Sequence, residues 1–236
     1  MEKEMFQKGL RDGIPIALGY LAVSFAFGMM AAEGGLPVLE ATLISAMNVT
    51  SAGQFAGLEI LLTGGTVLEM MLTQLVINLR YSLMSVSLSQ KLDRTVAFPH
   101  RFLIACGVTD EIFGIASTQP GKIKASYVYG AMCVAIPGWV CGTALGAAAG
   151  AVLPGFLTSA LSVAIYGMFL AIIIPPAKKD RAVLFVVLLS MGISCAFTFV
   201  PVLNRVSTGF VIIITAVLVS ALAAILRPVE TEEEAS

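Results

Sequence analysis

The sequence carries little charge and almost no histidine or tryptophan. Charged residues make up 12% of the 236 positions, and the chain has one His and one Trp, whereas soluble domains carry about 25% charged residues. Hydrophobic residues reach 58% and the mean hydropathy is +0.92. A chain this poor in polar groups cannot cover a water-facing surface, so the composition predicts an integral membrane protein.

Sequence patterns of enzymes and of metal sites are absent as well. The chain has no G-x-S-x-G elbow, no H-E-x-x-H pair and no glycine-rich phosphate loop. Its four cysteines lie in apolar runs without C-x-x-C spacing, so we expect them to pack as small buried side chains. The Lys and Arg residues mostly flank the apolar runs instead of forming a patch that could bind phosphates. We therefore expect no enzymatic activity, no metal, no cofactor and no nucleic-acid partner.

Eight apolar runs fill most of the chain, and most are close to the ~20 residues that a membrane-spanning helix needs. The runs are 13–32, 38–63, 67–89, 102–118, 127–152, 156–175, 182–202 and 208–226. We predict an all-α, polytopic integral membrane protein with about six to eight helical segments, some of them broken or re-entrant. A single transmembrane domain would occupy 13–226, between a cytoplasmic N-terminal segment at 1–12 and an acidic cytoplasmic tail at 227–236.

The basic residues constrain how these segments cross the membrane. Short loops rich in Lys and Arg tend to stay in the cytoplasm, and here they precede the first run and follow the third, fourth and sixth runs. Eight simple crossings cannot place all four on one side. The conflict disappears if runs 38–63 and 67–89 together make one net crossing and if run 102–118 enters and leaves on the same face. Six full crossings and two cytoplasmic termini then follow.

Polar residues interrupt the second run. Ser51 and Gln54 lie on either side of Gly53 within a polar stretch at 45–54, and we predict an unwound segment there. Unwinding would free backbone N–H groups with a partial positive charge suited to a carboxylate. The alternative is an unbroken helix whose Ser, Thr and Asn side chains bond to carbonyl groups one turn back.

Ionisable residues within apolar runs need partners. Arg80 lies about thirteen residues into its run, too deep to reach water easily, and would either clamp a substrate carboxylate with its fork of donors or form a structural ion pair with Asp110 or Glu111. These two adjacent acids would point about 100° apart on a helix and so serve different roles. Two carboxylates close together also make proton binding available near neutral pH. Glu59 and Glu69, by contrast, lie near a turn at the membrane edge, where we expect both to be solvated.

Glycine spacing predicts close helix packing. Gly142, Gly146 and Gly150 fall on one helix face, as do Gly53 and Gly57, and small residues at every fourth position let two backbones approach. The neighbour could be another helix of this chain or a separate membrane subunit.

Five motifs in sequence resemble those of one transporter family, the AzlC-type large subunit of branched-chain amino-acid exporters. The motifs are Gly13-Ile14-Pro15-Ile16 with Gly19-Tyr20, Phe27-Gly28, Ser51 to Phe55, Asn78-Leu79-Arg80-Tyr81 and Thr109 to Phe113. The resemblance extends over about residues 6–200. It implies a multi-pass protein of the bacterial inner membrane that exports leucine, isoleucine, valine and analogues, with a small AzlD-type membrane subunit as partner. This chain has Tyr81 where the family is expected often to have His, so a titratable ring beside Arg80 is missing.

Together, the motifs and the buried charges predict a proton-coupled secondary transporter whose substrates include methionine as well as the branched-chain amino acids. The expected substrate-binding residues are Ser51, Gln54, Asn78 and Arg80. Asp110 and Glu111 are expected to bind the substrate ammonium or a proton, and no residue is expected to be catalytic. A membrane channel, or an accessory subunit without alternating access, is the alternative.

Overall fold

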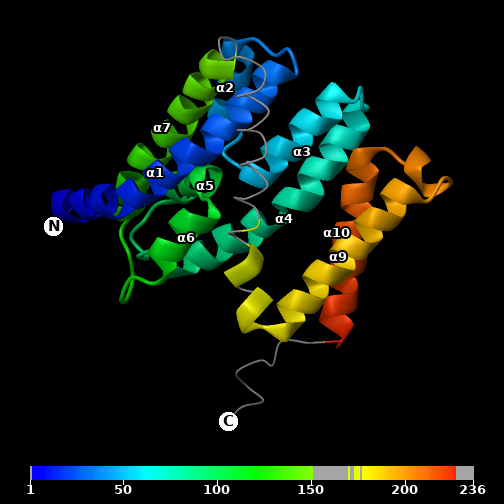
Figure 1. The fold of residues 1–236 in the computed structure, drawn as a ribbon. Coiled ribbons are helices and arrows are strands. Elements are labelled where there is room, and N and C mark those ends of the chain that lie inside the picture. Colours follow the sequence, from blue (N-terminus) through cyan, green and yellow to red (C-terminus); the bar gives the residue numbers. More distant parts are fainter. Residues whose placement is uncertain (1, 151–169, 171–172, 176, 227–236) are drawn as a thin grey trace. The chain divides into compact units, whose positions relative to one another are not determined.

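The computed structural model describes residues 2–150, 170, 173–175 and 177–226, nearly all of them in helices (Figure 1). The elements are α1 (Glu2–Glu33), α2 (Val38–Met47), α3 (Ser51–Leu62), α4 (Val67–Lys91), α5 (Phe98–Gly107), α6 (Asp110–Ser117), α7 (Ala125–Gly150), α9 (Arg181–Phe199), a short 3-10 helix (Leu203–Arg205) and α10 (Thr208–Leu226). By length and apolar composition, α1, α7, α9 and α10 are each able to cross a membrane. The predicted all-α membrane fold is confirmed.

The helices coincide with seven of the eight predicted apolar runs. Five runs form one helix each, whereas 38–63 and 102–118 are each divided into two. The remaining run, 156–175, lies almost entirely outside the described residues, as does the predicted tail at 227–236. The first helix begins at Glu2, so the predicted N-terminal segment continues into the first span without a break.

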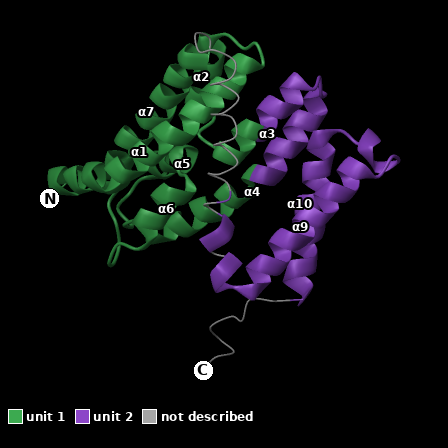
Figure 2. Cartoon of the chain, viewed as in Figure 1, with its two compact units in different colours: residues 1–55, 78–165 green, residues 56–77, 166–236 purple. Residues whose placement is uncertain are grey.

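The chain forms two compact units (Figure 2). Unit 1 comprises residues 1–55 and 78–165, and unit 2 comprises residues 56–77 and 166–236. Helices α3 and α4 each begin in one unit and end in the other. Unit 1 contains both helix breaks. Of the helices from α1 to α7, only the second half of α3 and the first half of α4 lie in unit 2.

Unit 1 is built on a parallel pair of long helices, α1 and α7, which lie side by side (Figure 1). A Cβ atom added at Gly130 would overlap the carbonyl oxygen of Phe6, and one added at Gly146 would overlap that of Phe25. These contacts advance in the same direction along both helices, which makes the pair parallel. Only glycine permits so close an approach of two backbones. The predicted glycine face at 142–150 therefore packs inside this chain.

The polar stretch of the second run is a helix break, as predicted. Helix α2 ends at Met47, Asn48 is extended with φ −137° and ψ 91°, and α3 starts at Ser51. Within the break, the Thr50 hydroxyl donates to Asn48 Oδ1 at 2.8 Å. The side-chain bond takes the place of a helical backbone bond, which is how Asn and Thr compete with helix formation. The unbroken-helix alternative is excluded.

A second break separates α5 from α6. Val108 and Thr109 are both extended, with ψ values of 134° and 171°. The segment that contains this break also returns to its starting point, because Leu92 and Ile123 form a parallel bridge in which Asp93 N–H donates to the Ile123 carbonyl at 2.8 Å. The two ends of segment 93–122 therefore lie side by side at one end of unit 1. That run 102–118 enters and leaves on one face of the membrane stays a prediction.

Arg101 fastens the connection that precedes α5. Its guanidinium donates to the carbonyl oxygens of Val96 at 2.9 Å and Asp93 at 2.8 Å, and it also contacts Ser89. Five donors in a rigid fork suit this role, because one side chain can satisfy several loop carbonyls. In the same connection, the backbone N–H and hydroxyl of Thr95 donate to Asp93 Oδ1 at 2.9 and 2.7 Å and hold the pKa of the Asp93 carboxyl below its ordinary value.

In unit 2, the start of α10 is held by a buried carboxylate on α4. Glu69 is only 3% exposed, and its Oε1 accepts a hydrogen bond from Gly209 N–H at 2.8 Å. The expectation that Glu69 is solvated is therefore wrong. The first turn of α10 has N–H groups without intrahelical partners, and the buried Glu69 carboxylate binds one of them and suits the positive end of the helix. Glu59 is exposed, as expected.

Helix α9 presents apolar side chains outward and has no buried residue among those described. The four cysteines are exposed as well: Cys106, Cys133, Cys141 and Cys195. Their predicted burial is wrong. A membrane helix can direct small apolar side chains to the lipid as easily as to a protein core, because lipid tails are equally apolar.

Candidate functional site

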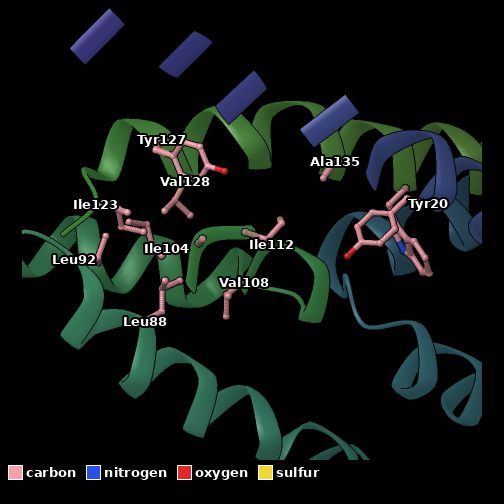
Figure 3. Close-up of a cluster of buried hydrophobic side chains, with 12 residues drawn as sticks. Tyr20, Leu88, Leu92, Ile104, Val108, Ile112, Ile123, Tyr127, Val128 and Ala135 are labelled. Carbon is pink, nitrogen blue, oxygen red and sulfur yellow. The ribbon is translucent and has the colours of Figure 1, made fainter. Parts of the chain in front are cut away.

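Both helix breaks of unit 1 reach the same core region. Val108, from the second break, belongs to a buried cluster with Tyr20 and Trp139, and Val49, from the first break, packs against that cluster. Figure 3 shows Val108 and Tyr20 in this cluster. Tyr20 lies near the middle of α1 and Trp139 near the middle of α7. The two interruptions in the helices therefore meet about half-way along the α1–α7 pair.

Gln54 ties the first break to α7. The indole N–H of Trp139 donates to Gln54 Oε1 at 3.0 Å, and Gln54 Nε2 donates to the Ser45 hydroxyl. That hydroxyl in turn lies 2.6 Å from Thr143 Oγ1. All four side chains are at most 1% exposed. Buried polar groups that are fully paired fix one arrangement of the backbone around them, so this chain of bonds holds α2, α3 and α7 together across the unwound segment.

Tyr20 joins that arrangement to the second break. Its ring meets Trp139 edge-on, with the ring centroids 5.2 Å apart and the planes at 77°. Its hydroxyl lies 2.5 Å from Thr109 Oγ1 and also contacts the Glu111 carboxylate. Thr109 caps α6, since its Oγ1 accepts from Ile112 N–H at 3.3 Å. The phenol has one proton, so when it donates to the carboxylate it can accept from the threonine hydroxyl.

Arg80, which lies deep within its apolar run, has Asp110 as its anionic partner. Its Nη1 lies 2.9 Å from Asp110 Oδ2, and both side chains are a little over 40% exposed. The guanidinium also lies over the Tyr81 ring, 5.0 Å from its centroid, and donates to the Tyr81 hydroxyl at 3.3 Å. The structure therefore shows the ion-pair alternative for Arg80, and its exposure leaves the guanidinium accessible.

The two adjacent acids have different surroundings, as their spacing predicted. Asp110 faces the guanidinium, whereas Glu111 is exposed and has the neutral Tyr20 hydroxyl as its partner. In the part of the chain that the structure describes, no Lys or Arg pairs with Glu111. One negative charge at the second break is therefore not balanced by a cation.

The other predicted binding residues lie along the same elements. Ser51 is the first residue of α3 and borders the first break, while Asn78 precedes Arg80 by two positions on α4; both are partly buried. Gln54 is placed in the wall of the site, with both ends of its amide bonded to protein groups. The structure groups Arg80 with Asp110 and Tyr20 with Glu111.

Sequence reasoning assigned no role to several residues that build this site. They are Tyr20, Ser45, Thr109, Trp139 and Thr143. One signal was present: a buried Tyr or Trp usually needs a hydrogen-bond partner, and the chain has a single Trp in the middle of an apolar run. Its partner could not be read from the sequence because Gln54 is 85 positions away.

Metal chemistry gains no support from the side chains. Among the described residues, no group of three or more His, Cys, Asp or Glu side chains could hold a metal ion. The arrangement instead offers one unbalanced carboxylate, one accessible guanidinium, and two helix starts at the unwound segments. This set of groups complements a small molecule that carries both an ammonium and a carboxylate.

Sequence comparison places the chain among known proteins. The sequence profile described as AzlC protein matches residues 15–153, more than half of the chain. The chain belongs to the AzlC family. It is 34% identical over 176 residues to an uncharacterised membrane protein of Archaeoglobus fulgidus (74% of this chain, 77% of the relative), and 26% identical over 184 residues to the inner membrane protein YgaZ of Escherichia coli (75% of each). An uncharacterised membrane protein of Helicobacter pylori strain J99 is 22% identical over 183 residues (74% and 78%). No solved structure matches the chain significantly.

The AzlC-matching region contains the whole candidate site. Residues 15–153 include both helix breaks, the Arg80–Asp110 pair and the network around Trp139. Helices α9 and α10 lie beyond it. This AzlC-family chain is thus a membrane protein whose family-defining part coincides with the broken helices of unit 1.

Proposed function

We propose that this AzlC-family protein is the large subunit of a secondary transporter that exports branched-chain amino acids across the bacterial inner membrane, together with a small AzlD-type subunit. The observation that carries the proposal is the meeting of two helix breaks in mid-helix beside an unbalanced carboxylate. Broken helices at such a depth are typical of transporter binding sites, where freed backbone groups and helix ends hold a polar substrate in an apolar setting.

The groups at the breaks complement a zwitterion. Glu111 accepts the substrate ammonium, because its own partner, the Tyr20 hydroxyl, leaves its negative charge unbalanced. The carboxylate is met by Arg80, which can turn from Asp110 to the substrate while remaining close to it. The first N–H groups of α3 add partial positive charge at the other break. Ser51, at the start of α3, and Asn78, two positions before Arg80 on α4, would supply further polar contacts.

Substrate selectivity follows from apolar packing. The side chain of the amino acid would lie against the apolar residues around Val49 and Val108. Because one methylene group changes binding by only about 1–3 kcal/mol, valine, leucine, isoleucine and methionine should all pass, with leucine and valine differing by less than about 200-fold.

Proton coupling uses the same carboxylate. Glu111 would bind either the substrate ammonium or a proton, so that loading the amino acid on the cytoplasmic side releases a proton there and unloading it outside allows another to bind. In each bound state the Glu111 carboxylate then has a positive partner, either a proton or the substrate ammonium, so it is never left as an isolated charge in hydrocarbon. The cycle is an antiport of protons against amino acid.

Everted membrane vesicles that contain the chain and its small partner test the proposal. An imposed pH gradient should drive saturable leucine uptake, and preloaded unlabelled leucine should accelerate entry of labelled leucine. Saturation and counterflow separate a carrier from a channel or an accessory subunit. E111Q should abolish gradient-driven uptake at equal protein level, while E59Q, at an exposed glutamate of α3, should transport normally. Full uptake by E111Q would refute the role of Glu111.

A charge exchange tests Arg80. R80Q and D110N should each lower leucine uptake at least tenfold, because each leaves the partner uncompensated. If the pair is purely structural, the exchanged variant R80D/D110R should restore uptake. If the guanidinium also meets the substrate carboxylate, the exchanged variant should fold but transport poorly. Normal uptake by the two single variants at equal protein level would contradict both roles.

A further inference from the structure

A cavity lies in unit 1, apart from the helix breaks. It encloses about 460 Å³ where α1, α5 and α7 begin, a volume within the ~300–1,000 Å³ of small-molecule sites. Its lining residues are Glu2, Thr95, Val96, Ala97, His100, Lys124, Ala125, Ser126 and Tyr129. None of them takes part in the bonds around Trp139 or in the Arg80–Asp110 pair.

The lining is suited to a phosphate group. Lys124 supplies a full positive charge, and Ala125 and Ser126 form the start of α7, where N–H groups lack intrahelical partners. The start of α5 offers less, because Pro99 has no N–H and the His100 N–H already donates to the Ala97 carbonyl at 3.1 Å. Independently of the α7 start, the Ser126 hydroxyl oxygen is buried and has no hydrogen-bond partner among the described residues. A buried hydroxyl without a partner in the wall of a cavity indicates a missing polar ligand.

One acidic residue makes the site selective. Glu2 also lines the cavity, and its carboxylate would repel a bare anion. Together with Lys124 in the same lining, it instead favours a ligand that carries an ammonium beside its phosphate. His100 and Tyr129 complete the polar wall, with His100 Nδ1 2.9 Å from the Tyr129 hydroxyl.

The surroundings place the cavity at the level of lipid headgroups. The neighbouring segments 91–94 and 122–124 hold five charged residues, which do not enter hydrocarbon without a large free-energy cost. Beside them, α5 exposes apolar side chains: Phe98 is 77% exposed, Phe102 60% and Leu103 54%. A polar cavity next to an exposed apolar helix face matches a phospholipid with its headgroup in the cavity and its acyl chains along α5.

We propose that this cavity binds the phosphoethanolamine headgroup of a membrane phospholipid. Lys124, Ser126 and the start of α7 hold the phosphate, and Glu2 holds the ammonium. Bound lipid would join α1, α5 and α7 at one end of unit 1. The site is independent of the proposed transport.

Native mass spectrometry of the full chain in detergent tests the site. The probes are phosphatidylethanolamine, phosphatidylcholine and phosphatidylglycerol with identical acyl chains. One phosphatidylethanolamine should bind about fivefold more tightly than phosphatidylcholine, whose quaternary ammonium has no N–H to donate, and more tightly than the anionic phosphatidylglycerol. If millimolar soluble phosphoethanolamine displaces the bound lipid, the headgroup alone suffices for binding. If the lipid is retained and the preference for ethanolamine persists, the acyl chains also contribute to binding. Equal binding of all three lipids would overturn the proposal.

Variants assign the residues. K124Q should weaken binding of every phospholipid about fivefold, and E2Q should abolish the preference for ethanolamine over choline. S126A should weaken binding without changing the preference. K3Q is the matched control, because Lys3 neighbours Glu2 in α1 but does not line the cavity, and it should bind like the unmodified protein. Unchanged binding by K124Q and E2Q, with melting temperatures equal to that of the unmodified lipid-free protein, would refute the site.

Discussion

The bond between Trp139 and Gln54 should be worth more than a typical hydrogen bond between membrane helices. Such bonds average about 0.6 kcal/mol, with a maximum near 1.7, because a polar group that loses its partner usually finds another. Here both side chains are 1% exposed, and the other end of the Gln54 amide is already bonded to Ser45. Loss of the Trp139 N–H leaves Gln54 Oε1 a buried acceptor without its donor, at a cost of about 1–3 kcal/mol.

W139F is the perturbation that isolates this bond. Phenylalanine keeps an aromatic ring against Tyr20 but removes the indole N–H, and the smaller ring adds a packing loss of its own. Q54L removes the acceptor instead. A double-mutant cycle of W139F, Q54L and the double variant, measured by equilibrium unfolding of the full chain in mixed micelles, separates the bond from the packing losses. The coupling free energy should lie near the membrane maximum, at about 1.5–2 kcal/mol.

The W139F substitution should also affect transport. Because Gln54 holds the first helix break, W139F should lower the maximal rate of leucine export more than it changes the apparent affinity. L145F is the control: Leu145 lies on the same helix and is 55% exposed, so its replacement should alter neither stability nor export. A coupling free energy below about 0.5 kcal/mol would show that the bond does not fix the break, and the account of the first break would then be wrong.

Three further substitutions probe other contacts. Y20F keeps the ring against its aromatic neighbour but removes the hydroxyl at the second break, and should raise the apparent KM for leucine several-fold with little change in melting temperature. G146A should reduce the free energy of unfolding by at least about 1–3 kcal/mol and so lower the melting temperature, since a methyl group would overlap the backbone of α1. G19A, at an open position, should leave the melting temperature unchanged. E69A should cost about 1–3 kcal/mol by leaving Gly209 N–H unsatisfied, and E69Q clearly less. Equal melting temperatures for E69A and the unmodified protein would contradict the assigned contact.

The helical framework was predictable because its causes are local. Apolar runs of spanning length need no long-range information, and the helix breaks fall where Asn48, Thr50 and Thr109 offer side-chain bonds that compete with the helix. The distribution of basic loops predicted that run 102–118 enters and leaves on one face of the membrane, and the bridge between Leu92 and Ile123 brings the two ends of the surrounding segment together. The need of Arg80 for an acid was equally local, because an unpaired guanidinium in hydrocarbon is too costly.

Partners were not predictable in the same way. Asp110 and Glu111 are adjacent and chemically similar, and only the positions of α1 and α4 decided that one faces Arg80 and the other Tyr20. The burial of Glu69 depended on the start of α10, 140 positions away.

The amino-acid sequence thus determined that this AzlC-family chain forms membrane helices, where they break, and which residues could not remain alone. The tertiary structure decided which side of each helix meets protein and which meets lipid, and so which hydroxyls and acids are buried and that the four cysteines are exposed. The physical reason is that hydrocarbon and protein core are equally apolar: hydropathy separates membrane from water, but it cannot separate the two apolar environments within the membrane.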